Sequence, residues 1–275
     1  NLGDTLKHGL GRIPSPFDAR DWPVERLAIL IADGVAVPVT WTDPVVLDQG
    51  QTPTCVGNAG AGWVASAEAN AIENSTITEA FAQRLYVLCK ARDGDNQDGT
   101  TVRTLAKVLK DLGYVDAYAF GTYDQGHAWV TAHGPCVTGE RWDYSMEETD
   151  AQGYVHPDGS DAGGHSTLWI GVNGPGDRNR NSWGKAWGLG GDFLVTATDF
   201  RDILSNGGEV MMAVKYVKPA PIPVPPAPTP TPPPAPPTPP APPPAPSDVA
   251  KLLRRIISTL KAALTELERL LKDVT

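Results

Sequence analysis

Apolar residues recur at helical spacing in two stretches of the first half of the chain. In residues 78–92 they follow the i, i+4, i+7, i+8 rule of one helix face, at Phe81, Leu85, Leu88 and Cys89. In residues 100–113 they again share one face before the helix stop Gly113, at Val102, Leu105, Leu109 and Leu112. A run of small residues, Ala59–Ala71, predicts a further helix that begins at or near Cys55 and packs closely against its neighbours.

The second half of the chain has a different pattern. Short runs rich in β-branched and aromatic residues lie between turns rich in Gly and Asn, at 166–173, 191–199 and 209–217. Residues 137–163 have little periodicity and many turn residues, so we expect a long loop there. Helices followed by antiparallel strands predict an α+β fold of two layers with a cleft between them.

Both ends of the chain differ from this central part. Residues 1–40 hold turn signals and one apolar patch, Leu27–Val37, and we expect them to form an N-terminal arm laid on the domain. The domain itself is predicted to span residues 41–218. Of the 27 prolines in the chain, 18 fall in residues 219–246, which predicts a stiff polyproline II linker without a core.

Residues 247–275 predict an amphipathic helix for oligomerisation or docking, with Ser247 as a suitable N-cap. Its apolar stripe keeps a seven-residue repeat at Leu253, Leu260, Leu267 and Val274, at Ile256, Ala263 and Leu270, and at Ile257, Leu264 and Leu271. The stripe is about 44 Å long at 1.5 Å per residue, and a domain behind a stiff linker cannot cover it. We expect self-association into a bundle of three or more helices; docking on another protein's helices or on a membrane surface are the alternatives.

Charge and hydropathy exclude two kinds of partner. The residues before the linker carry 17 Lys and Arg against 28 Asp and Glu, a formal charge of −11. The basic surface that nucleic acid requires is therefore missing. No run of 18 or more apolar residues is present, which predicts that no segment spans a membrane.

Three cysteines, Cys55, Cys89 and Cys136, are too few for a disulfide scaffold, and their odd number leaves at least one thiol free. Pairing of Cys89 with Cys136 stays open at this point. A free Cys55 would stand at the start of the small-residue helix, where the helix dipole lowers the pKa of a thiol.

Two further segments hold residues that suit thiol chemistry. A thiol with a pKa of about 8.5 needs a neighbouring imidazolium to become a nucleophile at neutral pH. His165 leads into an apolar strand, and Asn181 opens the segment "NSWGKAWG", residues 181–188. Gln49 stands six residues before Cys55, where its amide could serve the same site.

These residues resemble, in order and spacing, those of the papain-like cysteine peptidases. That family carries Gln, Cys, His and Asn in this order, and Asn181–Gly188 matches its Asn-Ser-Trp-Gly-x-x-Trp-Gly motif in full. Cys55 and His165 are 110 residues apart, less than the ~130–150 of the cathepsin-type signature. The chain is most similar to the compact bacterial or tailed-phage branch, and the resemblance covers residues 38–217.

The resemblance implies a role for each of these residues. Cys55 would be the nucleophile, with His165 as its acid and base and Asn181 to orient the imidazole. The side chain of Gln49 and the backbone N–H of Cys55 would bind the oxyanion of the transition state. Trp183 would shield the His–Asn hydrogen bond from water.

On the substrate side, the resemblance implies that the backbone at Gly99 pairs with an extended polypeptide. The implied activity is that of a cysteine endopeptidase that forms an acyl-enzyme, without cofactor or metal. The loop 93–104 lacks the Gly and the Glu that a calcium loop needs. Whether residues 1–40 obstruct the cleft stays open.

The terminal helix adds a tether to this implied activity. It favours a homo-oligomer or attachment to a larger assembly, and with it an extracellular or virion-associated protein. Two alternatives remain: a hydrolase of cell-wall peptides, and a catalytically inactive papain-like module that serves such an assembly by structure or binding.

Overall fold

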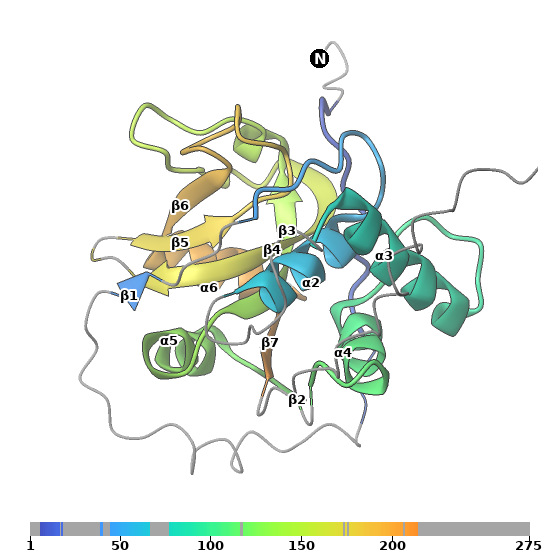
Figure 1. Cartoon of the computed structure of the whole chain (residues 1–275). Coiled ribbons are helices and arrows are strands. Elements are labelled where there is room, and N and C mark those ends of the chain that lie inside the picture. Colours follow the sequence, from blue (N-terminus) through green and yellow to red (C-terminus); the bar gives the residue numbers. More distant parts are fainter. Residues whose placement is uncertain are drawn as a thin grey trace, which may run out of the picture. The chain divides into compact units, whose positions relative to one another are not determined.

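The computed structural model describes residues 6–16, 18, 39–40, 45–66, 77–115, 118–172, 174, 176–205 and 207–213. All of them belong to one compact unit, Asn1–Ile222, whose elements are shown in Figure 1. The linker 219–246, the terminal helix 247–275 and the patch 27–37 lie outside the described residues and stay predictions. Among the helices that are described, none is long and apolar enough to cross a membrane.

Three helices form the first layer, as the apolar spacing predicts. They are α2 (Cys55–Ala65), α3 (Glu79–Asp93) and α4 (Val102–Asp111). Small residues let α2 approach its neighbours: a Cβ on Gly57 would lie 2.6 Å from the carbonyl oxygen of Ala82 in α3, and one on Gly60 would lie 2.6 Å from Leu105 in α4. The expected close packing of α2 is therefore confirmed.

An antiparallel sheet forms the second layer. Its strand order is β2-β7-β3-β4-β5-β6, and the short β1 pairs with β4. The strands are β1 (Val39–Thr40), β2 (Tyr118–Gly121), β3 (Cys136–Asp143), β4 (Asp161–Val172), β5 (Gly176–Arg180), β6 (Asp192–Thr196) and β7 (Glu209–Ala213). The α+β expectation is confirmed.

The expected loop at residues 137–163 is wrong at both of its ends. Residues 136–143 form β3, which pairs with β4 on one side and β7 on the other, and β4 already begins at Asp161. Because β3 is central and covered on both faces, seven of its eight residues are buried and no alternation marks it as a strand. The charged Glu140 and Arg141 obscured it further.

The strand expected at 191–199 is also too long. It ends at Thr196, whose hydroxyl accepts a hydrogen bond from the backbone N–H of Asp199 and so starts helix α6 (Ala197–Ser205). Helix α5 (Tyr123–Ala132) and a short 3₁₀ turn (Tyr144–Met146) were not predicted.

Two clusters of buried side chains lie on the two faces of the sheet. One joins α2, α3 and α4 to the face that carries Val137, Leu168 and Ile170. The other packs α5 and α6 against the opposite face and holds most of the buried tryptophans. Helix α2 lies along β4 in Figure 1, so the first turn of the helix meets the strand that carries His165.

Candidate active site

Cys55 is the first residue of α2 and is fully buried. The backbone N–H groups of Ser166 on β4 and of Val56 in the first turn both lower the pKa of the Cys55 thiol. Both effects favour the thiolate, as does the helix N-terminus. Ser166 follows His165 directly on β4.

His165 and Asn181 are joined by a buried hydrogen bond. The distance from His165 Nε2 to Asn181 Oδ1 is 2.8 Å, and the same Oδ1 accepts the backbone N–H of Ser182 at 2.7 Å. An atom that accepts from a backbone N–H is the amide oxygen, so His165 Nε2 carries the proton. His165 Nδ1 is buried and makes no hydrogen bond within the described part of the chain, which leaves it free to receive a proton.

Aromatic rings enclose this hydrogen bond. Trp183 lies against His165 with ring centroids 4.9 Å apart, and Trp142 meets the imidazole edge-on at 4.7 Å. Both indoles are buried. A hydrogen bond shielded from water in this way holds the ring orientation more firmly.

Gln49 is fixed next to the Asn181 segment. Its backbone N–H donates to the carbonyl oxygen of Ser182 at 2.8 Å, and its side-chain Oε1 accepts from the Ser182 hydroxyl at 2.6 Å. The amide nitrogen Nε2 donates to the carbonyl oxygens of Thr52 at 2.7 Å and of Gly9 at 3.0 Å. Gln49 therefore presents an oriented N–H, and a carbonyl of the chain itself accepts it.

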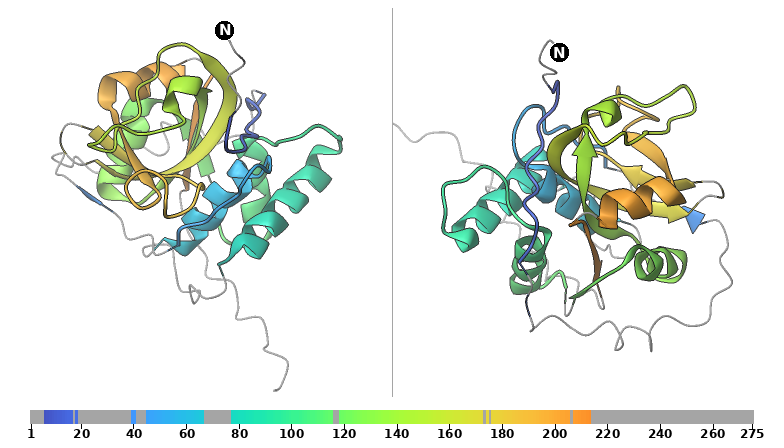
Figure 2. Two further views of the ribbon diagram at one scale, coloured as in Figure 1. Left: turned by 90° about the horizontal axis from the view of Figure 1, so that it is seen from above. Right: turned by 180° about the vertical axis from the view of Figure 1, so that it is seen from behind.

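The carbonyl of Gly9 belongs to residues 6–16, which are part of the N-terminal arm expected at residues 1–40. From here on, residues 6–16 are called the arm. Both views in Figure 2 show the arm, in dark blue, running between the helical layer and the sheet. It is bonded to both sides: the Gly9 N–H donates to Gly50, and the N–H groups of Gly11 and Arg12 donate to the carbonyl of Gly164, next to His165.

The arm also covers the aromatic side of the site. His8 stacks on Trp183 with ring centroids 4.5 Å apart and an interplanar angle of 12°, and Trp183 Nε1 donates to the Gly9 carbonyl at 3.3 Å. Cys55 and His165 have no exposed surface beneath these contacts. The arm therefore lies against Trp183 and Gln49, on the same side of the site.

Gly99 lies beside the arm, but the backbone hydrogen bonds to the arm are made by the next residue, Thr100. Thr100 donates its N–H to Gly11 and accepts the N–H of Ile13, which forms a parallel bridge between Thr100 and Arg12. Gly99 has φ +88°, and a Cβ there would lie 2.2 Å from the Gly11 carbonyl oxygen. Gly99 thus permits the close approach that Thr100 uses.

Burial favours the neutral forms of the thiol and of the imidazole. It raises the pKa of the Cys55 thiol to about 12, although the N–H groups of Ser166 and Val56 act in the opposite direction. Burial likewise lowers the pKa of His165 to about 4, against the effect of its hydrogen bond to Asn181. Both shifts disfavour a thiolate–imidazolium pair while the two side chains are buried.

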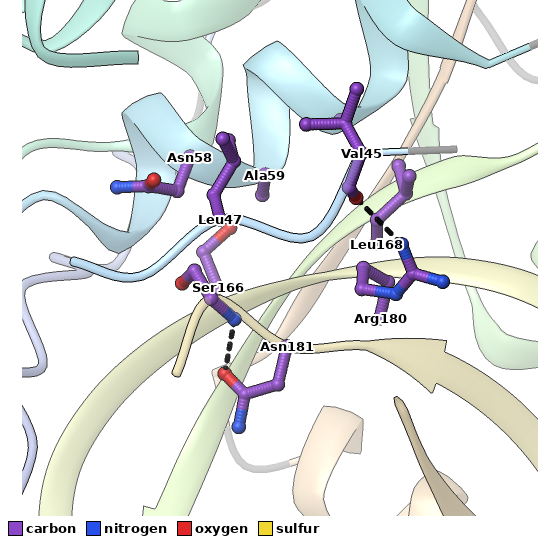
Figure 3. A pocket seen from close by; sticks show the side chains of 10 residues that line it. Val45, Leu47, Asn58, Ala59, Ser166, Leu168, Arg180 and Asn181 are labelled. Carbon is purple, nitrogen blue, oxygen red and sulfur yellow. Dashed lines mark hydrogen bonds between the residues drawn. The ribbon is translucent and has the colours of Figure 1, made fainter. Parts of the chain in front are cut away.

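A small cavity adjoins the site between α2 and β4. Figure 3 shows the side chains that line it, among them Asn58, Ser166 and Asn181. Its volume is about 10 Å³, no more than a single water needs. The cavity is therefore too small for a polypeptide substrate.

Within the described residues, no group of three or more His, Cys, Asp or Glu side chains is arranged to hold a metal ion. Cys89 and Cys136 are free buried thiols, so no disulfide joins them.

The sequence did not reveal that the backbone groups of Thr100 and Gly164 bond to the arm. Main-chain hydrogen bonds do not depend on the residue type, so no motif marks them.

Comparison with solved structures finds the same fold in cysteine proteases. Xylellain, a cysteine protease from Xylella fastidiosa, is similar over 78% of this chain and 100% of its own, with a TM-score of 0.56 and 22% identity. A procathepsin B from Trypanosoma congolense is similar over 78% of this chain and 88% of its own, with a TM-score of 0.54 and 13% identity. No family model and no curated protein sequence matches the chain. The fold is papain-like.

Proposed function

We propose that this chain is a cysteine endopeptidase that hydrolyses peptide bonds through Cys55, His165 and Asn181. The observation that carries the proposal is the buried His165–Asn181 hydrogen bond, which leaves His165 Nδ1 unprotonated and without a hydrogen bond among the described residues. The papain-like fold and the cysteine proteases that share it support the same chemistry.

The first half of the reaction acylates the enzyme. The Cys55 thiol gives its proton to His165 Nδ1, and the thiolate attacks the carbonyl carbon of the scissile bond. The tetrahedral intermediate collapses when the C–N bond breaks and His165 returns the proton to the leaving amine. The product is a thioester on Cys55.

The second half releases the acyl group. His165 takes a proton from water, the resulting hydroxide adds to the thioester carbonyl, and the C–S bond breaks with return of the proton to sulfur. Asn181 holds the imidazole in the same orientation through both halves. The side chain of Gln49 and the backbone N–H of Cys55 stabilise the oxyanion that forms each time.

The arm restrains this activity in the full chain. The Gly9 carbonyl accepts the side-chain N–H of Gln49, and the N–H groups of Gly11 and Arg12 donate to the Gly164 carbonyl. A substrate must compete with the arm for these hydrogen bonds. Once the arm leaves, hydration lowers the pKa of Cys55 and raises that of His165, because burial is the main cause of both shifts.

The experiment compares the full chain, a version without residues 1–18, and the same shortened version with Cys55→Ala, each incubated with unfolded casein. We expect fast hydrolysis only in the shortened version with Cys55, and covalent labelling of Cys55 by an epoxide inhibitor of cysteine peptidases. Neither hydrolysis nor labelling in that version would support the inactive module instead.

A parallel incubation with purified cell wall tests the other alternative. Release of muropeptides without casein hydrolysis would assign the chain to cell-wall peptides. Hydrolysis of casein alone would assign it to polypeptides, in keeping with the proteases that share its fold.

Residues 247–275 would attach the peptidase to a larger assembly. Its wide apolar stripe supports self-association or docking, and the proline-rich residues 219–246 would hold the catalytic unit away from the attachment point. The peptidase would then act at the surface of a larger assembly.

A further inference from the structure

The arm buries one charged side chain, and the surroundings of that side chain are specific. Arg12 Nη2 donates to Glu209 Oε1 at 2.9 Å and to the carbonyl oxygen of Gly207 at 2.5 Å, and Arg12 Nε reaches the same carboxylate oxygen at 3.2 Å. The side chain of Arg12 is 3% exposed and that of Glu209 is 9% exposed. We call this position the Arg12 site.

The walls of the Arg12 site come from the folded domain and not from the arm. Gly139 on β3 leaves room for the guanidinium: a Cβ there would lie 2.7 Å from Arg12 Nε and 3.1 Å from Glu209 Cγ. Val102 at the start of α4 closes the site from the helical layer, 3.0 Å from the same Cβ position. The site therefore exists only because β3 carries a glycine opposite an acidic residue on β7.

The electrostatics of the Arg12 site favour a cation. A second buried carboxyl, Glu140, is near enough that the charges of Arg12 and Glu209 both act on its pKa, in opposite directions. Among the described residues, the Glu209 carboxylate accepts hydrogen bonds from Arg12 and from the backbone N–H of Ser15, both in the arm. A neutral side chain there would leave a carboxylate partly buried and unpaired, which is costly.

The Arg12 site is also adjacent to the catalytic groups. The backbone N–H of Arg12 donates to Gly164, the residue before His165, and its neighbour Gly11 lies against Pro53, two residues before Cys55. A polypeptide that replaces the arm on these backbone groups brings one of its side chains to Glu209.

We propose that the Arg12 site is a substrate subsite, in which Glu209 selects polypeptides with an arginine side chain close to the cleaved bond. Arg12 is then a resident copy of the side chain that the subsite accepts. The inference rests on the proposed peptidase function and names its substrate class. The guanidinium places two donors, Nε and Nη2, on one oxygen of Glu209, which the single ammonium of lysine cannot do in the same geometry.

The first test maps cleavage sites. The full chain with Arg12→Gln, which loosens the arm, is incubated with unfolded casein, and mass spectrometry locates the cleaved bonds. We expect arginine to be enriched at one fixed position near these bonds, and the additional change Glu209→Gln to abolish the enrichment. Asp124→Asn, an exposed carboxylate on α5, is the matched control and should leave the preference intact.

The second test does not depend on catalysis. The full chain with Cys55→Ala and Arg12→Gln is titrated with a labelled alanine hexapeptide that carries one central arginine, and with the same peptide carrying citrulline. We expect the arginine peptide to bind about 10–100-fold more tightly, and the difference to vanish with Glu209→Gln.

The outcomes separate the two proposals. Hydrolysis without an arginine preference would overturn the subsite and keep the peptidase. An arginine preference in binding without hydrolysis would keep the subsite and overturn the peptidase. Equal binding of the two peptides by the form with Glu209 would overturn the subsite whatever the hydrolysis shows.

Discussion

Three consecutive residues each hold a different part of the candidate site. Asn181 binds the imidazole of His165, the hydroxyl of Ser182 binds the amide of Gln49, and Trp183 packs on the imidazole. The segment that starts with Asn181 therefore links His165 to Gln49. In the proposed peptidase this segment would couple the base to the oxyanion donor.

The link between Ser182 and Gln49 can be measured separately. Ser182→Ala removes the donor to Gln49 Oε1, so the amide loses its fixed orientation. We expect kcat/KM on a peptide substrate to fall about tenfold, and about 10²–10³-fold in Gln49→Ala, which removes the donor itself. Ser145→Ala, at an exposed serine, is the control. An unchanged rate in Ser182→Ala beside a large loss in Gln49→Ala would show that Ser182 does not position the amide.

Glu140 should make stability depend on pH. Burial raises the pKa of its carboxyl to about 7 from 4.5. Between these values the unfolded chain loses a proton that the folded chain keeps, so the stability contributed by the neutral carboxyl is present below pH 4.5 and is lost as pH rises through 7. Glu140→Gln has no such titration.

The measurement is urea unfolding of both proteins at pH 4.5 and pH 8. We expect the free energy of unfolding of Glu140→Gln, relative to the unchanged chain, to be higher at pH 8 by about 1–3 kcal/mol. His165 titrates in both proteins and cancels in the difference. A difference that is equal at the two pH values would contradict a raised Glu140 pKa.

At this scale the sequence predicts the residues that belong to motifs. Gln49 and Cys55, six apart, and Asn181 in its eight-residue pattern can be selected from the order of amino acids alone. The fold joins Asn181 to His165 and Gln49 to Ser182. Arg12 and Glu209 cannot, because they are 197 positions apart and neither stands in a motif. Only the fold brings such a pair together.

At the scale of elements, the arm is held by main-chain bonds and fits because its side chains are small at the closest approach. Gly11 has φ +142°, and a Cβ there would lie 2.3 Å from the Pro53 carbonyl oxygen. A Cβ on Gly9 would lie 2.3 Å from the carbonyl oxygen of Thr52. The arm therefore contacts the segment before Cys55 too closely to accept a larger residue at either position.

Gly11→Ala should consequently displace the arm without unfolding the domain. The added methyl group strains the backbone of residue 11 and overlaps Pro53, which destabilises the bound arm by about 1–3 kcal/mol. We therefore expect iodoacetamide to alkylate Cys55 at least about tenfold faster. Mass spectrometry maps the alkylated residue. Lys7→Ala is the control, because it removes an exposed ion pair of the Lys7 side chain with Glu148 and leaves the backbone bonds of Lys7 in place. Equal labelling rates in the two variants would show that the arm does not limit access to the thiol.

The sequence predicted α3 and α4, whose apolar residues form a stripe, but not β3. Strand β3 is covered on both faces and contains Gly139, Glu140 and Arg141, which are not typical of a buried strand. Gly139 is also the residue that makes room for the Arg12 side chain. Local pattern and function therefore conflict at Gly139.

At the scale of the whole molecule, the described unit and the tail predicted at 247–275 should separate in function. A chain that ends at Lys218 retains every described residue of the site. We expect it to sediment as a monomer and to cleave short peptides with the kcat/KM of the full chain, while the full chain sediments as a trimer or larger. Identical sedimentation of the two forms would show that residues 247–275 do not self-associate.

The arm shares one chain with the groups that it covers, and this has a kinetic consequence. An intramolecular occupant acts at an effective concentration set by its connection, on the order of millimolar for a short flexible one, and dilution of the protein leaves that value unchanged. A free peptide of the same sequence would have to reach comparable concentrations to compete. Lasting release therefore follows from a cut between the arm and the domain, after which the arm becomes an ordinary, dilutable ligand.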